Sequence, residues 1–268
     1  MTRCQTYGKQ QYKIICISAF FISMPLIFSI PSYAFSFVLK GENITWHPIV
    51  SIGAGASISS KAGESNTFPI QNPDTDEFYD YSIYKVTQSS SLLDGFLGAE
   101  CNFSPKWGLQ IGVDYNQEAP FTVQGTLTQG ADVQSEDIYH YNYRITTKQL
   151  LLEGKLLYTI REKYHPYLLV GVGAAFNRAY NYDTNVPPFI TFTRMYQNNS
   201  TSSFSYAIGV GIDVDVTSHM RVGAGYRFAD LGKVKLGSAV IDTTPVSGTL
   251  TQNNLYTNEV LAQITFIV

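Results

Sequence analysis

The sequence contains four histidines that are able to act as general bases in an enzyme: His47, His140, His165 and His219. A hydrolase or acyltransferase would place such a base beside a nucleophile and an orienting carboxylate. The chain has a repeating strand pattern, described below. None of the four histidines has a serine and a carboxylate placed beside it on an outer face of that pattern, at the same depth along its strands. The sequence therefore predicts no catalytic residue, no metal site and no cofactor, and a lipid-modifying enzyme is the least favoured function.

Charged side chains at alternate positions form the more informative set. They are Asp94, Glu100, Asp114, Glu153, Lys155, Asp213, Asp215, Arg221, Arg227 and Glu259. Successive strand residues point to opposite faces of a sheet, so this spacing places all ten on one face. Charges that leave water need partners, and we expect these to pair with one another in an interior. Lys148 is the exception, because it falls on the apolar face near the end of its segment.

Eight segments carry this alternation of apolar and polar residues, which is the period of a β-strand. They cover residues 46–59, 91–103, 107–117, 146–159, 165–178, 203–216, 219–229 and 256–268. Charged residues make up only 15% of the chain and aromatic residues 14%, with 21 glycines, which suits an all-β protein better than a helical enzyme. Pairs of glycines on the polar face are expected to leave room for the charged side chains.

The connections between these segments alternate in length. Those after the first, third, fifth and seventh segments are long and cover residues 60–90, 118–145, 179–202 and 230–255, whereas the other three are short. Outer-membrane barrels have long surface loops and short periplasmic turns, while soluble hairpins usually have loops of about 2–5 residues. The sequence therefore predicts an all-β fold: an eight-stranded antiparallel up-and-down transmembrane β-barrel, located in the cell outer membrane, with its polar face inside.

Aromatic residues of the apolar face gather near the ends of the segments. The set comprises Trp46, Phe103, Trp107 and Tyr158 near the short turns, and Tyr115, Phe176, Phe204, Tyr226, Phe228 and Tyr256 near the long connections. Aromatic side chains prefer the two interfaces of a membrane, so we expect two aromatic belts.

Residues 1–34 have the pattern of a cleaved signal peptide. Three basic residues precede the apolar run 14–30, and Ser32-Tyr33-Ala34 places small residues where a signal peptidase acts. Cleavage removes three positive charges, takes the formal net charge from −3 to −6 and disfavours nucleic acid as a partner. We expect residues 35–45 to form a periplasmic lead and residues 46–268 to form the barrel.

The chain resembles the small outer-membrane barrels related to the transmembrane domain of OmpA and to the opacity-type surface antigens. The resemblance is carried by the Val-Gly-x-Gly strands, by the stretch from Gly225 to Lys233 and by the final strand. Members of this group usually end on an aromatic residue that the insertion machinery recognises. Here Phe266 and Val268 stand in that place, and the resemblance implies that they form the insertion signal.

Three functions stay open at this point. A surface antigen or structural protein would have a lumen filled by side chains and four long extracellular loops for contact with a host or surface ligand. The first two loops are rich in Tyr and acidic residues, and the alternative is that they are plainly solvated. A narrow channel of the OmpW type would pass small or apolar solutes through the charged interior. A membrane-embedded enzyme is the third. In each case outer-membrane lipid, lipopolysaccharide and the barrel-insertion machinery are the expected partners.

Overall fold

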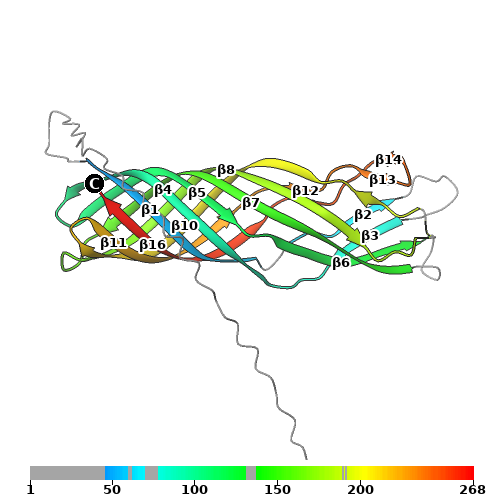
Figure 1. Cartoon of the computed structure of the whole chain (residues 1–268), viewed down its shortest axis with the longest axis horizontal. Helices are drawn as coiled ribbons and strands as arrows, with labels where there is room; N and C mark the ends of the chain where they lie inside the picture. The colour runs from blue at the N-terminus through cyan, green and yellow to red at the C-terminus, as the bar shows by residue number, and fades with distance from the viewer. Residues whose placement is uncertain (1–45, 60–61, 70–77, 131–136, 189, 191) are drawn as a thin grey trace, which may run out of the picture. The chain divides into compact units, whose positions relative to one another are not determined.

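The computed structural model describes residues 46–268 with the exception of 60–61, 70–77, 131–136, 189 and 191 (Figure 1). All described residues belong to one compact unit. The expected signal peptide and periplasmic lead lie outside them. No helix in the described part of the chain is long and apolar enough to cross a membrane.

Eight strands form a closed ring. They are β1 (Trp46–Ser59), β4 (Gln88–Ser104), β5 (Trp107–Glu118), β7 (Asp137–Tyr158), β8 (Tyr164–Thr184), β10 (Asn199–Thr217), β11 (Met220–Asp230) and β16 (Tyr256–Ile267). Each pairs antiparallel with the next in chain order, and β16 returns to pair with β1. This confirms the predicted all-β, eight-stranded, up-and-down barrel.

The strand bounds agree closely with the sequence pattern except at one end of β7 and β8. The alternation was expected to begin at residue 146 in β7, but this strand begins at Asp137. In β8 it was expected to end at residue 178, but this strand ends at Thr184. Residues 137–145 of β7 no longer pair with β5; they pair with β6 (Phe121–Gly130) instead. Two barrel strands therefore continue beyond the ring into a second sheet.

This second sheet, which we call the distal sheet, consists of β2 (Asn66–Pro69), β3 (Phe78–Ile83), β6, residues 137–145 of β7 and residues 179–184 of β8. It lies at the end of the barrel away from the C-terminus (Figure 1). Residues 60–90 and 118–145 were expected to be loops, and for these strands that expectation is wrong. Phe121, Val123 and Leu127 alternate with polar residues and are all buried, so the strand period was present here as well.

Short strands also occupy the two other long connections. Strand β12 (Val234–Lys235) pairs with β15 (Thr251–Gln252), and β13 (Ala239–Ile241) pairs with both β14 (Thr244–Val246) and β9 (Met195–Tyr196). These short strands pack on the distal sheet through Tyr196, whose ring centroid lies 5.7 Å from that of Tyr81.

Tyrosines make the core of the distal sheet. Tyr81 is 0% exposed, and besides Tyr196 its ring meets those of Tyr141 at 5.3 Å and Phe68 at 6.0 Å. Tyr182 joins them because the β7–β8 register shifts beside Asn181, whose φ of 54° is in the left-handed region that Asn tolerates. The extra residue turns Tyr182 to the inner face, where its ring lies 5.0 Å from that of Tyr196.

Candidate functional site

The interior of the barrel contains two connected groups of ion pairs, and the larger one surrounds Arg227. This side chain is 2% exposed. Its Nε donates to Glu259 Oε2 at 2.6 Å, and its Nη1 donates to Asp114 Oδ2 at 3.1 Å and more weakly to Asp94 Oδ2 at 3.4 Å. Nη2 donates to Asn116 Oδ1 at 2.6 Å. One buried guanidinium thus serves three carboxylates and an amide, the arrangement that a buried charge requires.

The second group lies nearer the short turns and is centred on Arg221. Its Nη1 donates to Glu100 Oε2 and its Nε to Asp215 Oδ1, both at 2.8 Å. Asp215 has the more open position, with a side chain that is 27% exposed. Its other oxygen, Oδ2, lies 2.8 Å from His165 Nε2, so this group reaches the rim of the barrel.

Lys155 lies between the two groups. Its Nζ donates to Gln263 Oε1 at 3.1 Å and lies 3.8 Å from Glu153 Oε1. The amide of Gln263 in turn donates to Asp213 Oδ1 at 2.8 Å. The ammonium also faces the rings of Phe96 and Tyr167, at 5.5 and 5.1 Å from their centroids. Aromatic faces of this kind stabilise a desolvated cation.

Two of these contacts span the full width of the barrel. Arg227 on β11 reaches Asp114 on β5, and Lys155 on β7 reaches Gln263 on β16. In the closed ring of eight strands, β11 lies four strands from β5 in either direction, and β7 lies four strands from β16. The two strands of each contact are therefore diametrically opposite. Side chains from opposite walls therefore meet in the middle of the lumen at two levels.

Glycines make room for these side chains at particular points. A Cβ on Gly211 or Gly225 would lie 2.4 or 2.3 Å from the Tyr167 hydroxyl, so the Tyr167 ring fills the space over both. A Cβ on Gly223 would lie 1.9 Å from Asp213 Oδ1. Glycine is required here by the close approach of inward side chains.

All ten charged residues that the sequence pattern put on the polar face lie on the inner wall, and the structure brings them into the contacts described above. Sequence reasoning missed several inward residues: Phe96, Leu151, Leu157, Tyr167 and Leu169, which are buried. It also missed Glu118, which accepts a 2.6 Å hydrogen bond from Ser57 Oγ. The signal was present, because these residues share the parity of the polar-face residues in their own strands.

The outer wall of the ring is apolar. Leu93, Leu97, Leu152, Leu168 and Ile208 are all exposed there. Of the expected belt residues, Phe103, Trp107, Tyr115, Phe176, Phe204, Tyr226 and Tyr256 are exposed, while Trp46, Tyr158 and Phe228 are half-buried. Trp107 packs on Tyr158 with 4.9 Å between the ring centroids, and Phe228 packs on Tyr256 with 5.7 Å between them.

The C-terminal residues close the ring beside β1. The backbone N–H of Val268 donates to the carbonyl of Pro48 at 2.9 Å. Phe266 and Val268 are both exposed on the outer wall, so their side chains are accessible to a partner. Their role in insertion stays a prediction.

The histidines are placed differently from one another. His165 is buried inside the barrel, where Thr159 Oγ1 lies 3.1 Å from its Nδ1 and Asp215 on its other nitrogen. His140 is in the distal sheet, with Nδ1 2.8 Å from the Tyr84 hydroxyl. His165 therefore has a hydroxyl and a carboxylate neighbour, but inside the barrel rather than on an outer face, and Arg221 already holds that carboxylate. Within the described ranges, no three His, Cys, Asp or Glu side chains are grouped to hold a metal ion.

Burial changes the acidity of the tyrosines in the distal sheet. Loss of solvent raises the pKa of Tyr81 and Tyr182 well above the usual value of about 10. Tyr141 and Tyr143 are shifted in the same direction for the same reason. Residues 60–90 and 118–145 were expected to be Tyr-rich loops that offer adaptable contacts to partners or are plainly solvated. For their tyrosines Tyr79, Tyr81, Tyr141 and Tyr143, which are buried, both expectations are wrong.

A closed antiparallel ring with an apolar outer wall and a charged interior is the architecture of a transmembrane β-barrel. Sequence comparison gives the family: the outer membrane protein beta-barrel domain matches residues 80–263, more than two thirds of the chain. The chain belongs to this family, and it is an outer-membrane protein.

Several solved structures are similar to it. OprG from Pseudomonas aeruginosa is 14% identical, with a TM-score of 0.45, over 83% of this chain and 96% of that one. Ail, the attachment invasion locus protein of Yersinia pestis, is 13% identical, with a TM-score of 0.33, over 82% and 98%. The outer membrane protease OmpT from Escherichia coli is 10% identical, with a TM-score of 0.43, over 88% and 100%. No curated protein matches the sequence.

Proposed function

We propose that this protein is a sealed outer-membrane barrel that holds a folded distal sheet on the cell surface for contact with partners, and that it has no enzymatic activity. The observation that carries the proposal is the pair of diametral contacts inside the lumen. Arg227 and Lys155 are held to opposite walls, and the Tyr167 ring lies beside the ammonium of Lys155. A narrow channel would need a water path past all three, so the channel reading is less favoured.

The distal sheet is the part that would meet a partner. Tyr81, Tyr141 and Tyr143 are committed to its core. The contacts would therefore come from apolar side chains that remain exposed: Ile138 on β7, which is 65% exposed, and Phe192 and Met195 of the connection 179–202, which contacts the sheet through Tyr79. Exposed apolar side chains on a rigid support suit protein or glycan surfaces. The distal sheet would face the outside of the cell, because the longer connections of outer-membrane barrels face outward.

Three further parts of the proposal concern biogenesis and lipid. Residues 1–34 would direct export and be removed, with residues 35–45 left as the periplasmic lead and 46–268 as the barrel. Phe266 and Val268 would be read by the insertion machinery. The apolar outer wall contacts membrane lipid, and we infer that lipopolysaccharide is the lipid at the distal end.

Planar bilayer recording of the refolded mature chain tests the sealed lumen. The wild-type barrel is expected to be electrically silent. A Lys155→Ser/Tyr167→Ala variant, which removes a diametral contact and its neighbouring ring, is the positive control and is expected to show increased current. Stable, reproducible conductance of the wild type at the level of this variant would overturn the proposal.

A further inference from the structure

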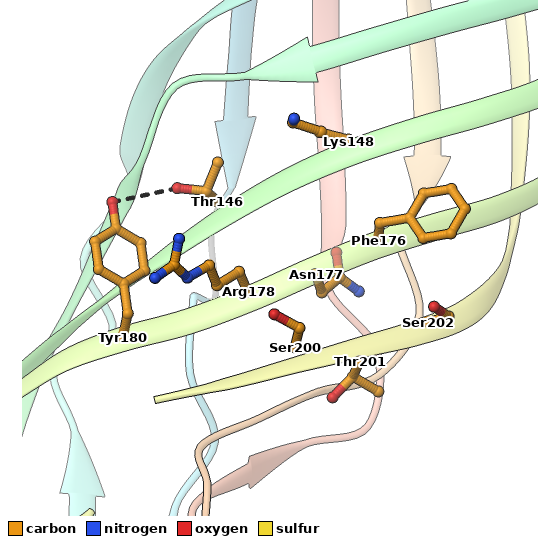
Figure 2. A pocket seen from close by; sticks show the side chains of 9 residues that line it. All are labelled: Thr146, Lys148, Phe176, Asn177, Arg178, Tyr180, Ser200, Thr201 and Ser202. Atoms are coloured by element: carbon orange, nitrogen blue, oxygen red, sulfur yellow. Dashed lines mark hydrogen bonds between the residues drawn. The ribbon is translucent and has the colours of Figure 1, made fainter. Parts of the chain in front are cut away.

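A pocket of about 450 Å³ opens on the outer wall where β7, β8 and β10 lie side by side (Figure 2). Lys148 and Arg178 contribute positive charges to it, and Ser200, Ser202 and Thr146 contribute hydroxyl groups. Phe176 contributes an apolar face. The lining thus combines two cations, several hydrogen-bond donors and one exposed ring.

The two cations are neighbours on adjacent strands. Lys148 pairs in register with Phe176, and Arg178 pairs with Thr146, so the two are diagonal across the β7–β8 pair, a spacing of about 7–8 Å. Over the described residues neither has a carboxylate oxygen within 4.0 Å. The guanidinium of Arg178 lies 5.3 Å from the Tyr180 ring, and Tyr180 is itself fixed by a 3.3 Å hydrogen bond from Thr146 Oγ1.

The pocket lies at the edge of the apolar band. Below it, toward the short turns, the outward residues of these strands are apolar and include Leu150, Val172 and Phe204. In the pocket they become Lys148, Arg178 and Ser202, and beyond it Arg144 adds a further exposed positive charge on the same face of β7. A cation in the hydrocarbon would cost about 2–4 kcal/mol, but one at the interface costs little. This boundary is the level at which lipid headgroups begin.

We propose that this pocket binds a phosphorylated headgroup of a lipid in the outer leaflet. Arg178 can donate two parallel hydrogen bonds to a phosphate, and Lys148 supplies a second charge from the neighbouring strand. The serine hydroxyls complete the donor set, and an acyl chain descends over Phe176 and Phe204. The mature chain has an expected net charge of −6, so this local pair, not the field of the whole protein, would attract the anion. The assignment rests on the proposed orientation, with the distal sheet outward.

Native mass spectrometry of the barrel released from phosphatidylcholine nanodiscs tests the site. The probe is the bis-phosphorylated lipid anchor of lipopolysaccharide, compared with its enzymatically dephosphorylated form. The wild type is expected to retain the phosphorylated lipid, and Lys148→Gln/Arg178→Gln is expected to weaken retention by about tenfold or more, since two charge-assisted contacts are lost. The charge-preserving variant Lys148→Arg/Arg178→Lys should keep most of it.

A matched control removes two other positive charges, at the opposite membrane interface. Lys106 and Lys163 are exposed in the short turns, so Lys106→Gln/Lys163→Gln should bind as the wild type does. Equal retention of the dephosphorylated lipid, or equal loss in the control variant, would overturn the site. Full displacement by inorganic phosphate would make it a site for free anions and overturn the lipid assignment. A conducting barrel that still selects the phosphorylated lipid would contradict the proposed function and leave this site standing.

Discussion

The barrel wall and the distal sheet are built from the same alternation of apolar and polar residues, but they bury opposite halves of it. In the wall, Arg227 and Glu259 are buried while Leu97 and Leu152 are exposed. In the distal sheet, Tyr81 and its aromatic neighbours are buried. The alternation therefore specifies the strand, and the surrounding medium decides which face is the inside.

The two interiors are also stabilised by different interactions. Ions in the lumen each have a desolvation cost of several kcal/mol, which only close pairing offsets. The distal core gains from apolar burial, at roughly 25 cal/mol per Å², and from ring contacts worth about 0.5–1.5 kcal/mol each. We therefore expect the lumen to fail when one partner is removed and the distal sheet to fail when a ring is removed.

The largest effect is expected for Arg227→Ala. Removal of the guanidinium leaves the carboxylates of Asp94, Asp114 and Glu259 buried together, and loss of one partner of a buried ion pair costs about 3–5 kcal/mol. Urea unfolding in lipid vesicles measures it. Lys235→Ala, at an exposed charge outside the ring, is the control and should change stability by less than about 0.5 kcal/mol. Equal destabilisation by the two variants would contradict the claim that the ion cluster stabilises the barrel.

The next largest effect is expected for Tyr81→Ala, and it should be local. Loss of a fully buried ring costs about 3 kcal/mol, but the ring of eight strands is stabilised separately. Limited proteolysis should therefore release fragments from the distal sheet while the barrel stays intact. Tyr81→Phe keeps the ring and should resist cleavage nearly as the wild type does. Loss of the whole barrel in the alanine variant would show that the two regions are not independent.

A pH dependence should distinguish the two regions as well. The folded distal sheet keeps its tyrosines neutral because burial raises the pKa of Tyr81, Tyr182, Tyr141 and Tyr143. Their contribution is complete below the unfolded pKa of about 10 and is lost as the pH rises above it. Ultraviolet titration should show these tyrosines ionising after the exposed ones, together with loss of the distal sheet. If all tyrosines titrated together near their usual pKa, this core would be absent.

The smallest effect is expected at the register shift in β8. Asn181 adopts a φ of 54°, where a residue with a Cβ and no local hydrogen bond is strained by about 1–2 kcal/mol. Asn181→Ala should therefore destabilise the distal sheet by about 1 kcal/mol, and Asn181→Gly should be close to neutral. Proteolysis rates of the two variants give the comparison, and a more stable alanine variant would contradict the assigned conformation.

The sequence predicted the barrel well because each ring strand carries a long alternation with charges confined to one face. Phe121–Gly130 carries the same alternation, but it was assigned to a loop because the length of the connection dominated the interpretation. Tyr182 was unpredictable for another reason, since a single bulge at Asn181 reverses the parity of the residues that follow. The partners of Arg227 also lay beyond prediction, because contacts across a closed ring depend on the register of all eight strands.

Site-resolved amide hydrogen exchange on the wild type, Arg227→Ala and Tyr81→Ala tests most directly the claim that two differently stabilised regions share these strands. Arg227→Ala is expected to raise exchange in the ring strands around the lumen cluster, β4, β5, β11 and β16. Tyr81→Ala is expected to raise exchange in β2, β3 and β6 and to leave those four strands protected. A uniform increase across the chain in either variant would contradict the account.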